Sequence, residues 1–190
     1  MILDLIKAYF SIFVVMDTLG NLPIFFTFMK SVAEKKRKEV ALQTIYIAGA
    51  VLLVFLFFGH RVLSFFNVDF QSFKIAGGII VLIFGLKLVI GLKILESRFK
   101  TYRTAMVPLA TPLITGPATI TTIMIFVYQY GLLLTLLASV LNLFTAYLFL
   151  SRAENLNRIL GRQGSDALSK IMGLILTAIA VGFIKQGLFP

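Results

Sequence analysis

The sequence has no cysteine, no tryptophan and a single histidine, His60, among its 190 residues. Without cysteine the chain can form no disulfide, no thiolate metal site and no cysteine nucleophile. One histidine also excludes a cluster of histidine ligands around a metal ion. Gly-x-Ser-x-Gly, His-Glu-x-x-His and glycine-rich phosphate loops are missing as well. We therefore expect no enzyme activity, no catalytic residue, no metal and no cofactor.

Acidic residues are also few, with eight against eighteen basic ones and a net charge of +10. Such a charge could indicate a nucleic-acid partner. However, 59% of the residues are hydrophobic, whereas soluble domains are about 45–50% apolar. The mean hydropathy is +0.97, and the charges lie between long apolar runs. We interpret the chain as a membrane protein whose surroundings are the lipid bilayer, and we predict no nucleic-acid partner.

Six apolar stretches are long enough to be transmembrane helices, since a span needs roughly 20 residues to cross a hydrocarbon core about 30 Å thick. They are Leu3–Met29, Val40–Gly59, Phe70–Leu92, Thr104–Tyr128, Leu132–Leu150 and Ala167–Leu188. Backbone polar groups cannot stay unpaired in lipid, so these stretches must be helical. The first stretch contains Asp4 and Asp17 and lacks the pattern of a signal peptide, so we interpret it as a retained span. The predicted fold class is an all-α membrane protein with six transmembrane helices.

Basic residues are concentrated in alternate connections between these spans. The first, third and fifth connections hold Lys30, Lys35, Lys36, Arg37, Lys38, Lys93, Arg98, Lys100, Arg103, Arg152, Arg158 and Arg162. The opposite side holds little more than Lys7, Arg61 and Lys185. Cytoplasmic loops of membrane proteins carry an excess of lysine and arginine. We therefore predict a multi-pass protein of the cell (inner) membrane, with both termini outside the cytoplasm.

The chain resembles itself at one fixed displacement. The segment Lys74–Ile79 recurs as Lys170–Ile175, displaced by 96 positions, and the same displacement pairs Gly20 with Gly116. Three spans per copy is an odd number, so the second copy must enter the membrane from the opposite side. We predict two inverted three-helix repeats, residues 1–92 and 104–190, joined by a cytoplasmic linker of residues 93–103.

Four of the five prolines lie in the first and fourth predicted spans, the first helix of each repeat. Each proline removes a helical N–H donor and clashes with the preceding turn. The segments Asp17–Pro23 and Thr111–Thr119 combine these prolines with glycine in the middle of an apolar run. New half-helices are expected to begin near Asn21 and near Pro117, because asparagine is a good N-cap and proline is favoured at the first helical position. We predict that both helices are discontinuous near the bilayer centre.

Paired breaks of this kind predict a binding site. Non-helical backbone at that depth is tolerated only where it is buried in protein or lines a wet cavity. The half-helices beginning at Asn21 and Pro117 would direct their N-termini toward each other, which favours a carboxylate. The carbonyls of the unwound turns could accept from an ammonium, so a zwitterion fits. Such paired interruptions are typical of secondary transporters, and the plainer alternative is two kinks that only help packing.

Other residues within the spans are polar or small, and each polar one has two possible interpretations. Asp17 is the only acid well inside a span; it gates, carries a proton or contacts a substrate amine, or it only accepts N–H bonds within the break. Asn142 lines a cavity or bonds a neighbouring helix. Small residues in the third and sixth spans predict close contact between helices, and they are Gly77, Gly78, Gly85, Gly173, Ala178 and Gly182.

The two breaks resemble those of a known family. The segment Asp17–Phe25, followed by Pro108–Thr121, is similar to the MarC family of inner-membrane proteins, and Gly85–Lys87 is similar too. Thr18 departs from the pattern, because many members have proline there. The resemblance covers essentially the whole chain and implies a SnatA-like transporter of small neutral amino acids, with glycine and alanine as the expected substrates.

The resemblance also implies a secondary mechanism, driven by an ion or a proton and involving an elevator-like motion. Carried onto matching positions, it places substrate among Gly20, Asn21, Gly116, Pro117, Ala118 and Thr119, with Asp17, Thr18 and Thr115 as second choices. One alternative function is a channel or pore for a small solute or ion, whose charged ring an oligomer could supply. Another is a membrane scaffold that transports nothing, for which the two breaks would be unnecessary. The sequence leaves open the coupling ion, the direction of transport and whether the chain forms a homo-oligomer.

Overall fold

The structure is a computed structural model that describes residues 2–19, 22, 25, 29, 32–91 and 114–189. These residues form helices and connecting turns, with no strand among them. The helices are α1 (Ile2–Met16), α3 (Glu34–Phe65), α4 (Phe70–Ile90), α6 (Pro117–Tyr130), α7 (Leu132–Ser151) and α8 (Ala153–Leu188). The all-α class is therefore confirmed for the described part of the chain.

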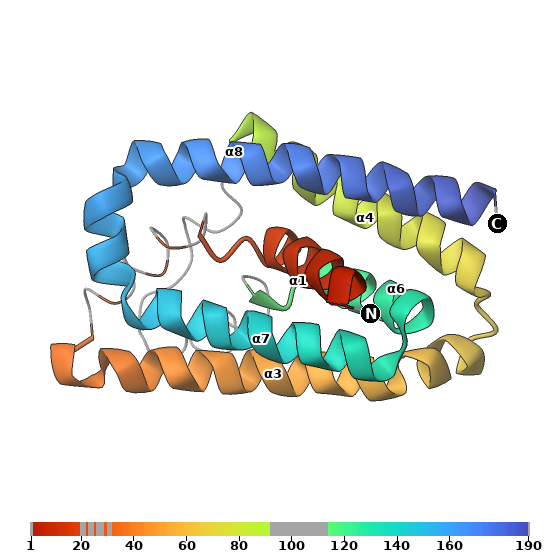
Figure 1. The fold of residues 1–190 in the computed structure, drawn as a ribbon, viewed down its shortest axis with the longest axis horizontal. Coiled ribbons are helices and arrows are strands. Elements are labelled where there is room, and N and C mark those ends of the chain that lie inside the picture. The colour runs from red at the N-terminus through yellow and green to blue at the C-terminus, as the bar shows by residue number, and fades with distance from the viewer. Residues whose placement is uncertain are drawn as a thin grey trace.

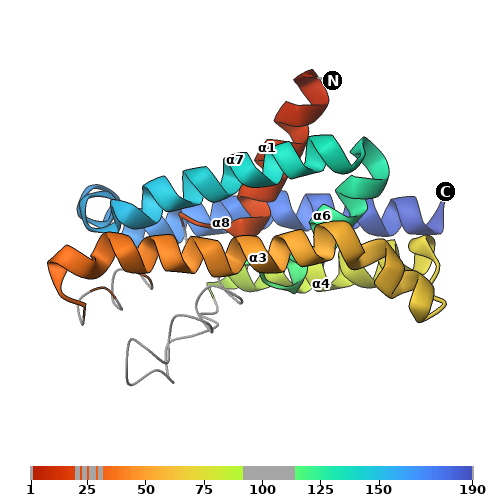
Figure 2. The same ribbon diagram turned by 90° about the horizontal axis from the view of Figure 1, so that it is seen from below.

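The long helices form two antiparallel pairs, with two shorter helices between them (Figure 1). α3 runs along α7 at one edge, and α4 runs along α8 at the other. α1 and α6 lie between the pairs, where α1 contacts α6, α7 and α8, and α6 contacts α3, α4 and α7. Figure 2 shows that α1 stands steeply across the long helices. Both short helices therefore end in the interior of the bundle.

Four segments are long and apolar enough to cross a membrane, and they are Glu34–Phe65, Phe70–Ile90, Leu132–Ser151 and Gln163–Leu188. Their outward surfaces are apolar: Leu133 is 71% exposed, Phe144 59% and Leu174 60%. Such large apolar surfaces need a lipid cover rather than water. α1 has 15 residues and α6 has 14, so each is too short to cross a core about 30 Å thick by itself.

Two helices extend beyond the predicted spans. α3 begins at Glu34, so Lys35–Lys38 form its first turn rather than a loop. Glutamate, lysine and arginine are good helix formers, and hydropathy reports only the apolar part of such a helix. α8 likewise begins at Ala153 and turns a corner at Gly161, whose φ of 62° combined with a ψ of −179° suits only glycine. An ion pair of 2.5 Å between Arg37 and Glu154 joins the starts of α3 and α8.

Glycines bring α4 and α8 into close contact. A Cβ added to Gly173 would lie 2.8 Å from the carbonyl oxygen of Gly85, and one added to Gly85 would lie 2.9 Å from the backbone nitrogen of Thr177. The predicted role of Gly85 and Gly173 in close packing is confirmed. The same prediction for Gly182 is wrong, because no atom lies within 4 Å of a Cβ placed there. Gly182 faces away from α4, which its position in the sequence alone does not reveal.

The turn between α3 and α4 is polar and lies outside the apolar segments. Asn67 adopts a φ of 52°, a conformation that asparagine tolerates better than most residues. Asp69 caps α4 by accepting from the backbone N–H of Ser72 at 2.8 Å and from its hydroxyl at 2.6 Å. These two bonds hold the pKa of the Asp69 carboxyl below its ordinary value. The cap fixes where α4 begins.

Gly173 and Gly182 provide a matched test of the α4–α8 contact. Gly173→Ala should destabilise the protein by about 1–3 kcal/mol, because the new methyl group overlaps the α4 backbone. Gly182→Ala should be neutral or stabilise by about 0.5–1 kcal/mol, since it only improves helix propensity. Thermal unfolding in detergent, followed by loss of the monodisperse size-exclusion peak, measures both. Equal melting temperatures for the two variants would contradict the assigned packing.

Candidate functional site

The end of α1 and the start of α6 meet in one buried cluster. Val14 and Val15 of α1 pack with Ala118 of α6, and the cluster is completed by Val81 of α4 and by Leu176 and Ala180 of α8. Val81 lies midway along α4, and Leu176 lies midway along the apolar part of α8. The two helix ends therefore meet at the middle of the long helices, where the bilayer centre would lie. We call this meeting point the junction.

On the α1 side, the junction carries a buried acid. Asp17 follows the last residue of α1, is 6% exposed and adopts a φ of 40°. Its backbone N–H donates to the carbonyl oxygen of Val14 at 3.2 Å, which closes the last turn of the helix. Thr18 beside it is also buried. Since the C-terminus of a helix carries a partial negative charge, the helix end and the Asp17 carboxyl together favour a cationic group.

On the α6 side, the junction carries a helix N-terminus. Gly116 is the N-cap and Pro117 the first residue, so the predicted helix start at Pro117 is confirmed. The N-cap is a glycine and has no side chain with which to cap this end, and the first N–H groups of a helix have no acceptor within it. The Thr119 hydroxyl instead donates to the carbonyl oxygen of Ile114 at 3.1 Å, which fixes the turn before the helix. This end of α6 favours an anionic group.

The predicted site residues have different positions in the structure. Thr115, Gly116, Ala118 and Thr119 are buried at the start of α6, and Asp17 and Thr18 are buried at the end of α1. Pro117 is exposed, so it shapes the helix start without belonging to the buried junction. Gly20 and Asn21 lie outside the described residues, as does the predicted helix start at Asn21.

Further polar side chains are buried behind the junction, on α6 and α7. Asn142 of α7 donates to the carbonyl oxygens of Tyr9 at 3.0 Å and Ala138 at 2.9 Å, so of its two readings the bond to a neighbouring helix is observed. The Tyr9 hydroxyl also bonds Thr145 of α7 at 2.9 Å. Tyr9 thus joins α1 to α7 through both its backbone and its side chain. In the sequence, this contact is indicated only by the single asparagine, Asn142, within an apolar segment.

The described part of the junction has no set of ligands for a metal ion. Among the described residues there is no group of three or more histidine, cysteine, aspartate or glutamate side chains that could hold a metal ion. Its polar groups are one carboxylate, hydroxyls and backbone amides, which suit hydrogen bonding to a small charged molecule.

The chain matches the model of the MarC family of integral membrane proteins over residues 3–189. The chain belongs to this family. It is 39% identical to the UPF0056 membrane protein MJ1677 of Methanocaldococcus jannaschii over 194 aligned residues, covering 96% of this chain and 95% of that protein. It is 32% identical to the UPF0056 inner membrane protein YhgN of Escherichia coli K12, covering 97% and 96% of the two chains. No solved structure matches the chain.

Membership of the MarC family agrees with the apolar exterior of the helices and makes the chain an integral membrane protein. The resemblance identified from the two helix breaks is confirmed at the level of the family. Relatives such as YhgN are described as inner membrane proteins. In this MarC family member the junction holds the one acid buried in the described interior, and we take it as the candidate site.

Asn142 offers a test of how α1 is held beside the junction. Asn142→Ala removes both hydrogen bonds and leaves a cavity, so it should lower the free energy of unfolding by about 1–3 kcal/mol. Thr145→Val removes the bonds that its hydroxyl forms with the Tyr9 hydroxyl and with the carbonyl oxygen of Leu141. It keeps the volume of the side chain and should cost less, about 0.5–1.5 kcal/mol. Thermal unfolding of the purified variants measures which substitution destabilises the protein more. An Asn142→Ala variant that is more stable than Thr145→Val would contradict the expected order.

Proposed function

We propose that this MarC family protein is a secondary transporter of small neutral amino acids, with glycine and alanine as substrates. The substrate binds at the junction, near the midplane, between the broken first and fourth transmembrane helices. The observation that carries the proposal is the meeting of two helix ends of opposite polarity, at Asp17 and at Gly116, in one buried region.

A free amino acid carries an ammonium and a carboxylate a short distance apart, and the junction offers a partner for each. The C-terminal end of α1 and the Asp17 carboxyl suit the ammonium, while the N-terminus of α6, which begins at a glycine N-cap, suits the carboxylate. The neighbouring Ala118, Val81 and Ala180 side chains are small or medium in size, which favours a substrate with a small side chain. The proposal gives the chain no catalytic role.

The proposal includes six transmembrane helices arranged as two inverted repeats. A displacement of 96 positions relates α4 to the apolar part of α8, and it relates α3 to α7. These are the two antiparallel pairs of long helices (Figure 1). The same displacement pairs Gly91, which ends α4 with a φ of 77°, with Gly187 near the end of α8. In this arrangement α1 and α6 are halves of the first and fourth spans, and both termini lie outside the cytoplasm.

Coupling to a proton or an ion is assigned to the same region. Asp17 is the one acid buried in the described interior, so it either binds the substrate ammonium directly or carries the coupled proton or cation. The elevator-like motion belongs to the proposal as well, and the contact that it concerns is the close approach of α4 and α8 at Gly85 and Gly173.

Reconstitution distinguishes a carrier from a channel. Proteoliposomes loaded with unlabelled glycine should take up labelled glycine by saturable counterflow, because a carrier exchanges substrate across its alternating site. Flux that rises linearly with concentration and shows no counterflow would favour a channel. Absence of flux for glycine, alanine and other small amino acids would reject the proposal.

Variants at the junction locate the site. Gly116→Leu places a bulky side chain at the buried start of α6 and should abolish uptake, as should Asn21→Leu. Asp17→Asn should lower uptake at least about tenfold, since hydrogen bonds to charged groups contribute about 1.5–3 kcal/mol. Gly182→Leu, on the open side of α8, is the matched control and should transport normally. Full uptake by a folded Gly116→Leu variant would show that the substrate binds elsewhere.

A further inference from the structure

The contact between α6 and α8 differs from the other contacts of α8. Within the described helices, the backbones of α6 and α8 do not pack closely, whereas those of α4 and α8 do. The two helices meet through side chains instead. The rings of Phe126 and Phe183 lie edge to face with centroids 6.0 Å apart, and the Gln129 side chain donates to that of Gln186. A contact made by side chains can open by rotamer changes and small helix shifts.

The facing residues change in size along this contact. On α6, residues at a spacing of four lie on one face, and this face runs from Ala118 at the junction through Thr122 to Phe126. On α8, the facing residues run from Leu176 and Ala180, which share a cluster with Ala118, to Phe183. We call these six residues the α6–α8 seam. At the junction the seam contains the small side chains of Ala118 and Ala180, and farther out it is filled by the buried rings of Phe126 and Phe183.

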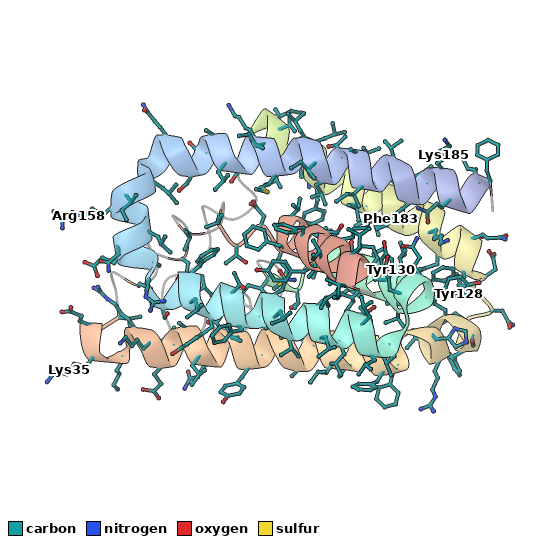
Figure 3. The ribbon with its side chains drawn as sticks, in the orientation of Figure 1. Lys35, Tyr128, Tyr130, Arg158, Phe183 and Lys185 are labelled. Carbon is teal, nitrogen blue, oxygen red and sulfur yellow. The ribbon has the colours of Figure 1, made fainter. Side chains whose placement is uncertain are left out.

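Figure 3 shows toward which end of the molecule the seam runs. Tyr130, Phe183 and Lys185 lie toward one end, whereas Lys35 and Arg158 lie at the other. The Tyr130 ring packs against Phe126 with centroids 5.2 Å apart. The seam thus leads from the junction toward the end of the structure opposite Lys35. There it is closed by the Phe126 and Phe183 rings and then by the Tyr130 ring.

Inside the two rings, the seam holds a hydroxyl that lacks a partner. The Thr122 side chain is fully buried, and its Oγ1 has no hydrogen bond in the described structure. Other buried threonines bond the carbonyl four residues earlier, as Thr44 does with Val40 and Thr135 with Gly131. A buried hydroxyl without a partner is unfavourable, so this position suits a water or a ligand that supplies one.

We propose that the α6–α8 seam is the path by which substrate passes between the junction and the face opposite Lys35, with Phe126 and Phe183 as its gate. Thr122 is the first polar group that a substrate meets inside the gate. This inference rests on the proposed transport function and deepens it. In the described conformation the gate is closed, because the two rings are buried against each other.

Thiol labelling tests access through the gate without requiring transport. The chain has no cysteine, so Thr122→Cys introduces a single reactive thiol. A small membrane-impermeant thiol reagent applied from the face that carries Lys185 should label it slowly in the otherwise unchanged protein. With Phe183→Ala added, labelling should be at least about tenfold faster, because the gate no longer protects the thiol. Phe126→Ala is the second gate variant, for the case in which Phe183→Ala does not fold.

Thr121→Cys is the matched control for labelling. Thr121 is also buried on α6, but it packs against Gly77 of α4 and lies off the seam. Its labelling rate should not change with either gate variant. If Thr122→Cys is labelled no faster in the gate variants, or if both cysteines become equally reactive, the seam is not the path.

Cross-linking tests whether the gate must open during transport. The double variant Gln129→Cys/Gln186→Cys places one thiol on α6 and one on α8, at a pair of side chains that contact each other beside the gate. A short, reducible thiol-to-thiol cross-linker should bridge them. Bridged protein should lose glycine counterflow and regain it on reduction, whereas each single variant treated with the same reagent should keep it. Unchanged counterflow in the bridged protein would show that α6 and α8 need not separate during transport, and it would reject the proposed gate. If no variant transports any amino acid, the proposed function fails while the labelling result still decides the path.

Discussion

The hydrocarbon core of a membrane offers no partner for a backbone N–H or C=O group, and the arrangement of this chain follows from that constraint. The long helices satisfy their own backbones. α1 ends and α6 begins inside the bundle, so the backbone groups at these two helix ends must be enclosed by protein. Their ends pack together with Val81 and Leu176 at the middle of the two long helices. The constraint thus brings helix ends of both polarities together at one buried place.

The lipid surroundings also explain why the contacts between helices are of two kinds. Lipid provides little hydrophobic drive for helices to associate, so close backbone approach through small residues stabilises a pair. Gly85 and Gly173 provide this for α4 and α8. The α6–α8 seam depends on the rings of Phe126 and Phe183 instead. Because one contact of α8 is closely packed and another is filled by side chains, a change of conformation would separate α6 from α8 before it separates α4 from α8.

The sequence predicts those features that lipid dictates directly. α7 spans Leu132–Ser151, close to the predicted Leu132–Leu150, and α6 begins at Pro117 as its glycine and proline indicate. The charged first turn of α3 and the corner at Gly161 were missed, because hydropathy carries no signal for helices that leave the membrane. The orientation of Gly182 and the unpaired hydroxyl of Thr122 depend on which helix lies opposite. No local pattern contains that information.

The polarity of the junction also bears on the choice between a carrier and an ion channel. A pore that selects ions lines its path with groups of one sign or with a ring of carbonyls. Here a carboxylate and a helix C-terminus stand on one side, and a helix N-terminus stands on the other. An ion of either sign would be attracted by one side and repelled by the other, whereas a zwitterion satisfies both. Phe126 and Phe183 close the proposed path in this conformation, and a binding site beneath a closed gate is the arrangement that alternating access requires.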